Sequence, residues 1–236
     1  MKISLVIPMY NESKIIADTA RTLSKYMSEN FESYEILFSD DGSTDGSGDA
    51  VRALALPNVS VVGYAQNRGK GSAVRCGVME AEGDMIMFTD ADLAYGTDVI
   101  RTYYEHYLEK HPDMMIGSRN LGKDGYEGYT FIRKLASKIY IKILCMIGGF
   151  KLSDSQCGCK AFGAKAAKDI FGRCAVDGFA FDFEAILWAG RLGYSIDELP
   201  VKIINHRESK VNVLRDSVKM LRDLMRIKKN VKNTKI

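Results

Sequence analysis

Short apolar runs alternate with longer amphipathic stretches along the first half of the chain. Each apolar run ends in a polar or glycine-rich turn, which is typical of a buried strand. The stretches between the runs space their apolar side chains three and four residues apart, which predicts helices. This alternation predicts an α/β fold with a mostly parallel central sheet flanked by helices on both faces. The predicted strands are 3–7, 36–38, 59–62 and 85–88, followed later by 114–117, and the predicted helices are 13–28, 48–55 and 71–82.

Composition indicates one large folded domain with a short appendage. The 236 residues are 46% hydrophobic and 27% charged, enough to bury a full core. Ten basic and three acidic residues after His206 give this tail a net charge of +7 within a chain of +3 overall. We therefore expect a catalytic domain over 1–210 and a basic amphipathic helix and tail over 211–236. The tail favours an anionic partner.

The five cysteines lack the paired spacing of a zinc site, and no signal peptide is evident. A reducing cytosol is the expected compartment. Cys157 and Cys159 are predicted to fill small buried spaces rather than to bind a metal.

Polar turns follow the first, second and fourth predicted strands. In a parallel sheet the carboxyl ends of the strands meet at one edge, where ligands bind because loops converge and helix N-termini point at anions. Residues 63–71 have the wrong spacing for a P-loop, and the first turn lacks a dinucleotide-binding glycine motif. Acidic turns therefore need a different explanation. They carry Pro8, Tyr10 and Glu12, then Asp40, Asp41 and Asp45, then Asp90, Ala91 and Asp92.

Asp90 and Asp92 form a candidate metal site. Two carboxylates one residue apart repel each other unless a cation lies between them, and Mg²⁺ typically takes one or two carboxylates together with phosphate oxygens. The sequence thus favours a hard divalent cation such as Mg²⁺ beside a nucleotide diphosphate. A simpler alternative is that Asp92 caps the helix beginning near Thr97, just as Asp45 is expected to order its own turn.

Four motifs in order resemble the signature of glycosyltransferase family 2. They are IPMYNE at 7–12, DDGSTD at 40–45, NRGKG at 67–71 and DAD at 90–92. DSQCGCK at 154–160, together with Glu184 and Pro200, is similar to the branch of dolichyl-phosphate glucosyltransferases and mannosyltransferases. The resemblance implies a GT-A fold and transfer of a hexose, with inversion, from UDP-glucose or GDP-mannose to a polyprenyl phosphate.

The resemblance also implies roles for individual residues. Pro8, Tyr10, Glu12 and Asp41 would hold the nucleoside, while Asp90, Ala91 and Asp92 would hold the cation and diphosphate near Lys70. Arg207 and Lys210 match a loop that closes over the diphosphate. In that loop Glu208 stands where the branch often has Gly. Elsewhere, in the motif at 154–160, Cys159 replaces a Phe that is usual in the glucosyltransferases.

Within the same resemblance, Arg119, Arg133 and Ser137 fall at positions that bind the acceptor phosphate. Arg133 and Ser137 are four apart on a predicted helix and so share a face, although a solvated helix face would also explain Arg133. Guanidinium groups suit phosphate oxygens. No histidine base is evident among His106, His111 and His206, and a phosphate acceptor is already charged at neutral pH and needs none.

Residues 131–150 are apolar apart from four basic side chains, an arrangement that suits a helix lying on a membrane surface. A buried helix or a homodimer interface explains the segment almost as well. The predicted location is therefore peripheral, at the cytoplasmic face of a membrane, with no nucleic-acid partner. Three other functions stay open: a family 2 transferase for a saccharide or another lipid, a nucleotidyltransferase, and a non-catalytic membrane-surface module.

Overall fold

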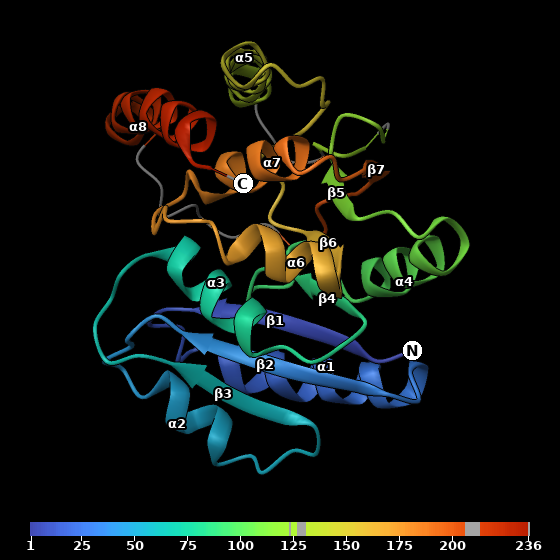
Figure 1. Cartoon of the computed structure of the whole chain (residues 1–236). Helices are drawn as coiled ribbons and strands as arrows, with labels where there is room; N and C mark the ends of the chain where they lie inside the picture. The colour runs from blue at the N-terminus through green and yellow to red at the C-terminus, as the bar shows by residue number, and fades with distance from the viewer. Residues whose placement is uncertain (123, 127–130, 206–212, 236) are drawn as a thin grey trace.

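A seven-stranded sheet forms the centre of the described part of the molecule (Figure 1). The computed structural model describes residues 1–122, 124–126, 131–205 and 213–235, without the side chains of 132, 133 and 213–222. The strand order is β3-β2-β1-β4-β6-β5-β7. The strands are β1 Ile3–Met9, β2 Tyr34–Asp40, β3 Val59–Gly63, β4 Met85–Phe88, β5 Met114–Ser118, β6 Lys160–Gly163 and β7 Ile196–Pro200.

Helices cover both faces of this sheet, as the sequence predicts. On one face α1 (Ile16–Asn30), α2 (Ser47–Arg52) and α4 (Asp98–Lys110) share a core with β1 and β2. On the other face lie α3 (Lys70–Glu80), α6 (Ala164–Phe171) and α7 (Phe181–Arg191). The two remaining helices, α5 (Phe131–Gly148) and α8 (Val213–Asn233), lie outermost and pack against α7 (Figure 1).

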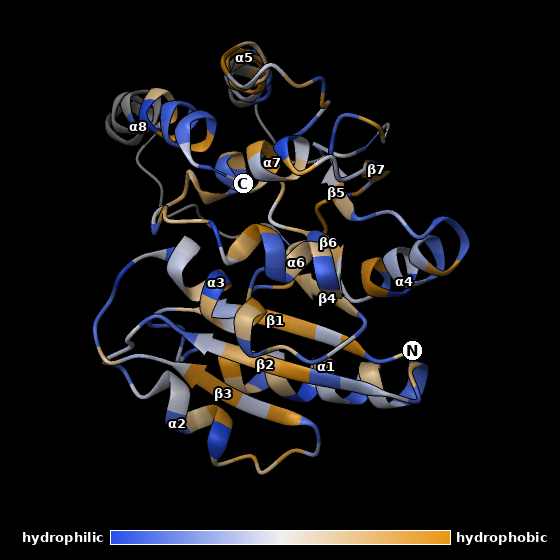
Figure 2. Cartoon of the chain, in the orientation of Figure 1, coloured by the Kyte–Doolittle hydropathy of each residue, from blue (hydrophilic) through white to orange (hydrophobic). Residues whose placement is uncertain are grey.

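Hydrophobic residues concentrate on the inner strands, whereas the described part of α8 is largely hydrophilic with a few apolar positions (Figure 2). Three of those positions, Leu224, Ile227 and Val231, are buried in the same core cluster as α7, while Met225 is 62% exposed. In the part of the chain that the structure describes, no helix is long and apolar enough to cross a bilayer.

One strand of the sheet runs against the others. β6 pairs antiparallel with both β4 and β5, while β1 to β4 are mutually parallel and β7 is parallel to β5. The amino end of β6 therefore meets the carboxyl ends of β4 and β5 at the same edge. This brings residues just before Lys160 next to residues just after Phe88, its partner in β4.

The first five strands and the predicted helices are present within a few residues of their expected bounds. β6, β7, α6 and α7 are not among the elements predicted from the sequence. β6 has only four residues and begins with a lysine, and β7 (IDELP) is a polar edge strand with a single buried residue. Periodicity cannot identify strands this short and polar, because their side chains are set by tertiary neighbours.

Pro8 lies inside the central strand β1 yet breaks no ladder hydrogen bond. The Val6 carbonyl accepts a hydrogen bond from the Thr89 N–H, so the backbone N–H and C=O groups of the even-numbered residues of β1 point toward β4. The last paired residues of β1 and β4 are Val6 and Phe88, and Val6 is two residues before Pro8. The missing N–H of proline therefore points to where β4 has already ended.

Gly77 lets α3 approach β1 closely. A Cβ built at this buried position would lie 2.3 Å from Cγ1 of Val6, while one at Gly190, exposed on α7, would meet nothing within 4 Å. We expect Gly77→Ala to lower the free energy of unfolding by about 1–3 kcal/mol through overpacking. Gly190→Ala should leave it unchanged or raise it by up to about 1 kcal/mol through helix propensity. Urea denaturation followed by circular dichroism measures both, and equal effects would contradict the packing argument.

Candidate active site

The turns after β1 and β2 are joined by hydrogen bonds at the carboxyl edge of the sheet. The Asn11 N–H donates to Oγ of Ser43 (3.0 Å), and the Thr44 N–H donates to Oδ1 of Asn11 (2.9 Å). The Glu12 N–H donates to Oγ of Ser47 (2.8 Å) at the start of α2. The two turns therefore form one wall of the site, although they are about thirty residues apart in the chain.

Asp45 orders this wall rather than facing a ligand, as the sequence suggests. Its carboxylate accepts from the Ser13 N–H (2.9 Å) and from both the N–H and the hydroxyl of Ser47 (3.0 and 2.5 Å). Burial alone would raise the pKa of Asp45, but the hydrogen bonds from Ser47 and Ser13 hold it well below its usual range. The carboxylate is thus kept ionised as a turn acceptor.

Three residues predicted to hold the nucleoside differ in how exposed they are. Tyr10 is exposed at the rim (41%), Glu12 is half-buried, and Pro8 is buried within β1. Pro8 is thus less accessible than Tyr10 and Glu12, and contact of all three with the nucleoside stays a prediction.

Asp41 is buried and accepts several hydrogen bonds from the segment that leads into α3. Its Oδ1 accepts from the Tyr64 hydroxyl (2.6 Å) and the Arg68 N–H (2.9 Å). Its Oδ2 accepts from the Asn67 amide (2.8 Å) and the Gly69 N–H (2.9 Å). In this structure the carboxylate therefore orders residues 64–69, and a direct contact of Asp41 with the base stays a prediction.

Lys70, the first residue of α3, reaches across to the end of β4. Its Nζ lies 2.5 Å from Oδ1 of Asp90, and both side chains are about a quarter exposed, at 25% and 29%. Burial opposes the charge on Lys70, but the carboxylates of Asp90 and Asp182 outweigh it and raise the pKa of Lys70. The predicted diphosphate-binding lysine and the first predicted metal ligand are thus in direct contact.

Asp92 shapes the turn that follows β4. Its Oδ1 accepts from the Ala94 N–H (3.1 Å), and its carbonyl accepts from the Asn205 amide (3.3 Å). Helix α4 has Thr97 at its N-cap, so Asp92 does not cap that helix. Ala91 between the two acids is buried, and its carbonyl accepts from the Thr19 hydroxyl (2.8 Å), which anchors the turn to α1.

The residues present fit a divalent cation that is shared with substrate. Asp90 and Asp92 offer only oxygen donors, at a partly exposed edge, and Mg²⁺ prefers one or two carboxylates with phosphate and water oxygens. Among the residues that the structure describes, no group of three or more His, Cys, Asp or Glu side chains could hold an ion. Two carboxylates would leave the rest of the coordination shell of a divalent cation to phosphate and water oxygens, which is the donor set expected of a metal–diphosphate site.

Arg119, the first residue after β5, forms a buried ion pair. Its Nε and Nη2 donate to the two oxygens of Asp154 (2.6 and 3.0 Å), and Asp154 is fully buried. Burial opposes the charge, but this carboxylate raises the pKa of Arg119 well above its usual range. The edge formed by Nε and Nη2 is occupied by Asp154, so any phosphate contact would use Nη1 or the second N–H of Nη2.

Tyr126 connects Arg119 to helix α5. The guanidinium carbon of Arg119 lies 5.3 Å from the centre of the Tyr126 ring, and the Tyr126 hydroxyl lies 3.4 Å from Oγ of Ser137. The structure thus brings together Arg119 and Ser137, two of the three predicted acceptor residues. The third, Arg133, lies one turn earlier on α5, and its side chain is outside the described residues, as are Arg207 and Lys210 in 206–212.

Sequence reasoning named Lys160 and Glu184 only as part of the resemblance, and it missed Asp182 and the burial of all three charges. Lys160 pairs with Asp182 (2.6 Å), and Glu184 accepts from the N–H groups of Ala175 and Val176 (2.9 and 2.8 Å). The one available signal was two acids within the otherwise apolar stretch at the start of α7, since buried acids need partners. Burial raises the pKa of Asp182 although the ammonium groups of Lys160 and Lys70 oppose this.

Solved structures and curated proteins similar to the chain agree on one fold. Glucosyl-3-phosphoglycerate synthase from Mycobacterium tuberculosis, solved with Mn²⁺, UDP and phosphoglyceric acid, superimposes with a TM-score of 0.73 at 18% identity, covering 100% of this chain and 80% of that one. The same enzyme solved with Mg²⁺ and UDP gives 0.68 at 19% identity, covering 95% of this chain and 79% of that one. This likeness confirms the GT-A fold.

Similar sequences point the same way. A dolichyl-phosphate beta-glucosyltransferase of Dictyostelium discoideum is 29% identical over 96% of this chain and 73% of its own length. The dolichyl-phosphate beta-glucosyltransferase of Saccharomyces cerevisiae is 29% identical over 96% of this chain and 74% of its own length. One of Trichomonas vaginalis is 30% identical, covering 95% and 72%.

The model of the family described as glycosyl transferase family 2 matches residues 4–171. That span includes the four ordered motifs, the contact of Lys70 with Asp90, and the pairing of Arg119 with Asp154. Sheet order, motif positions and sequence similarity therefore give one answer: the chain belongs to glycosyltransferase family 2.

Proposed function

We propose that this chain transfers a hexose from a nucleotide sugar to a polyprenyl phosphate. The observation that carries the proposal is the meeting of two different charged sites at one edge of the sheet. Asp90 and Lys70 form one, and Arg119 beside Ser137 on α5 forms the other. The names of the similar enzymes favour glucose as the sugar and dolichyl phosphate as the type of acceptor.

On the donor side, Tyr10, Glu12 and Asp41 are proposed to hold the nucleoside of UDP-glucose or GDP-mannose. Asp90 and Asp92 would hold Mg²⁺ or Mn²⁺, which would neutralise the charge developing on the leaving diphosphate. Lys70 lies beside Asp90 and would add a second positive charge there. Arg207 and Lys210 are proposed to close over the same group.

On the acceptor side, Arg119, Arg133 and Ser137 are proposed to orient the lipid phosphate. A phosphate monoester carries a charge near −1.5 to −2 at neutral pH, so its oxygen can attack the anomeric carbon without a general base. The catalytic task of these residues is then to align the acceptor with the bond that breaks. Direct displacement would invert the anomeric centre.

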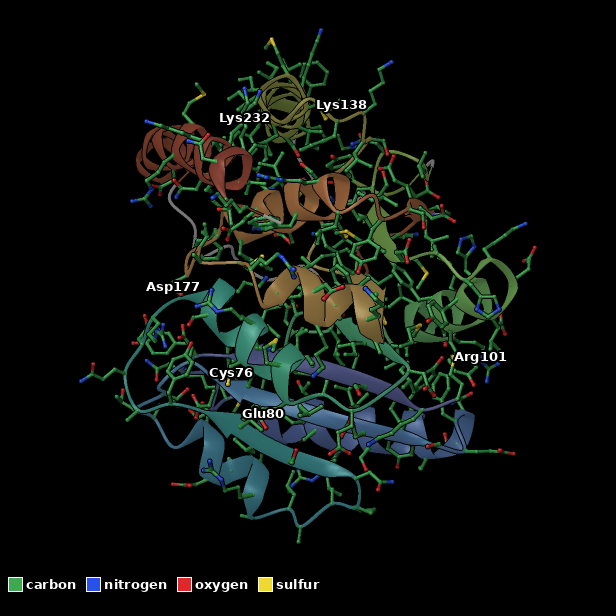
Figure 3. The ribbon with its side chains drawn as sticks, viewed as in Figure 1. Cys76, Glu80, Arg101, Lys138, Asp177 and Lys232 are labelled. Carbon is green, nitrogen blue, oxygen red and sulfur yellow. The ribbon has the colours of Figure 1, made fainter. Side chains whose placement is uncertain are left out.

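Helix α5 offers a surface suited to a membrane. Phe131, Leu135, Ile139 and Met146 are 78%, 48%, 53% and 72% exposed, while Ile141 and Leu144 on the same helix are buried. Exposed lysines border this apolar face, and Figure 3 labels Lys138 on α5 and Lys232 on α8 at the same end of the molecule. We name the four exposed residues of α5 the apolar face.

Helix α8 adds positive charge next to the apolar face. Nζ of Lys228 donates to the carbonyl of Ile147 (2.6 Å), which ties α8 to the end of α5. Lys229, Lys232 and Lys235 are exposed. Each lysine close to an anionic leaflet would contribute roughly 1 kcal/mol to binding. A peripheral position at the cytoplasmic face of a membrane would deliver the lipid phosphate to Ser137.

A family 2 transferase for a saccharide or another lipid is the nearest alternative, and it would need a general base for a neutral hydroxyl. A homodimer formed through the apolar face is the alternative to membrane contact. Mass spectrometry of the products formed with a panel of donors distinguishes a polyprenyl-phosphate transferase from a transferase for a saccharide or another lipid. The acceptors to compare are polyprenyl phosphate, phosphoglyceric acid and a simple saccharide; transfer only to the saccharide would contradict the proposal.

Asp92→Asn should lower kcat by at least roughly 100-fold, because the carboxylate is proposed to hold the cation that stabilises the leaving group. Asp49→Asn, on an 88% exposed side chain of α2, is the matched control and should be within 2-fold of the unaltered enzyme (about 0.4 kcal/mol). Steady-state turnover with saturating Mn²⁺ measures both. Activity of Asp92→Asn within a few-fold of the control would contradict the metal role.

Arg133→Ala should raise the KM for polyprenyl phosphate about 10-fold or more and change the KM for the nucleotide sugar by less than about 2-fold, since only the acceptor loses a charged contact. Arg101→Ala, on α4 (Figure 3), removes an exposed guanidinium elsewhere and serves as the control. Initial rates with each substrate varied in turn give the two constants. Equal changes in both constants would count against an acceptor site.

Replacing Phe131 and Met146 by Ser should weaken binding to vesicles that contain anionic lipid at least 10-fold, because each buried apolar side chain contributes about 1.5–3 kcal/mol. Leu108→Ser, 47% exposed on α4, is the control.

Binding of the unaltered protein should also weaken as salt rises from about 0.05 to 0.5 M, because salt screens exposed charges. Vesicle pelleting measures both effects, and salt-insensitive binding would remove the electrostatic part. A concentration-dependent dimer disrupted by the same double variant would favour the homodimer.

A further inference from the structure

Lys160, the first residue of β6, is a fully buried lysine. Its Nζ donates to Oδ1 of Asp182 and to the carbonyl of Cys157, both at 2.6 Å. It also lies 5.7 Å from the centre of the Phe88 ring. Removing two charges from water is expensive, and a buried ion pair often stabilises a fold no better than apolar residues of the same volume. The pair therefore needs an explanation other than folding.

Lys160 lies next to the backbone segment that packs against Asp90. In the antiparallel register Lys160 is opposite Phe88, so Gly158 falls opposite Asp90. A Cβ built at Gly158 would lie 2.2 Å from Oδ2 of Asp90, so backbone at this position forms a wall against the carboxylate. Because Lys160 holds the Cys157 carbonyl, it fixes the turn that makes this wall.

The aspartate end of the pair acts on the other neighbour of Asp90. Asp182 is in the first turn of α7, where the helix dipole favours a negative charge. Its charge attracts the ammonium group of Lys70, which in turn lies 2.5 Å from Asp90. Charges therefore alternate from the core to the edge of the sheet in the order Lys160, Asp182, Lys70, Asp90.

We infer that Lys160 and Asp182 are positioning residues for the donor site. The buried pair sets the wall on one side of Asp90 and the ammonium group of Lys70 on the other, which gives the carboxylate one orientation toward a cation. Both residues are buried, with Lys160 0% and Asp182 7% exposed. The inference rests on the proposed function, since it assigns the purpose of the pair to the metal role of Asp90. Partners behind metal ligands typically change metal affinity or activity 10- to 100-fold when altered.

The double variant Lys160→Met/Asp182→Leu removes the pair without leaving an unpaired buried charge. We expect its thermal midpoint to stay close to that of the unaltered protein. Mn²⁺ affinity, measured by electron paramagnetic resonance with UDP or GDP present, should fall about 10-fold or more, and kcat should fall similarly. Lys165→Met/Asp169→Leu makes the same chemical change in an i,i+4 pair on α6, where Lys165 is 84% exposed, and should bind Mn²⁺ like the unaltered protein.

Gly158→Ala provides a second test if the double variant does not fold. The added methyl group pushes on Asp90 from the wall and leaves both charges of the pair in place. It should also weaken Mn²⁺ binding about 10-fold while the circular dichroism spectrum stays unchanged. Unaltered Mn²⁺ affinity in a folded double variant, or in Gly158→Ala, would overturn the inference. If the unaltered protein itself shows neither Mn²⁺ binding nor sugar transfer, the proposed function fails instead.

Discussion

Carboxylates crowded at one edge of a sheet repel one another, and the structure around the site offsets this repulsion separately for each of them. Asp41 accepts backbone and side-chain hydrogen bonds, Asp90 faces an ammonium group, and Asp154 is held by a guanidinium fork. Hydrogen bonds and opposite charges offset the cost of holding polar and charged groups away from water. Several carboxylates can therefore lie at one edge of the folded sheet, which a site for a cation and a diphosphate requires.

The reversed strand β6 makes the arrangement around Asp90 feasible. A parallel strand in that place would put its carboxyl end, and another loop, at the edge. The antiparallel strand instead brings the segment that leads into β6, residues 157–159, against the end of β4. Backbone atoms can approach a carboxylate there because Gly158 has no Cβ. The same reversal places the buried ammonium group of Lys160 within reach of α7.

The outer helices connect the chemistry to the proposed lipid surface. Helix α5 buries Leu144 against the domain and leaves Phe131 and Met146 exposed, so its two faces have different environments. Its first turns are near Arg119 through Tyr126. A lipid phosphate bound there would leave its chain beside the apolar face, so one helix would serve both the acceptor group and its hydrocarbon.

Although the metal role of Asp90 stays a prediction, the order of motifs and the strand–helix alternation were sufficient to predict the parallel half of the sheet and the edge where the polar turns gather. Those features are local: a strand period, a turn composition and a fixed spacing of residues. Tertiary structure alone decided the contacts of Lys70, Arg119 and Lys160, because their partners are 20, 35 and 22 residues away. It also decided the direction of β6, since four residues carry no signal for parallel or antiparallel pairing. Long-range electrostatics and strand direction depend on the whole fold, and no window of sequence contains them.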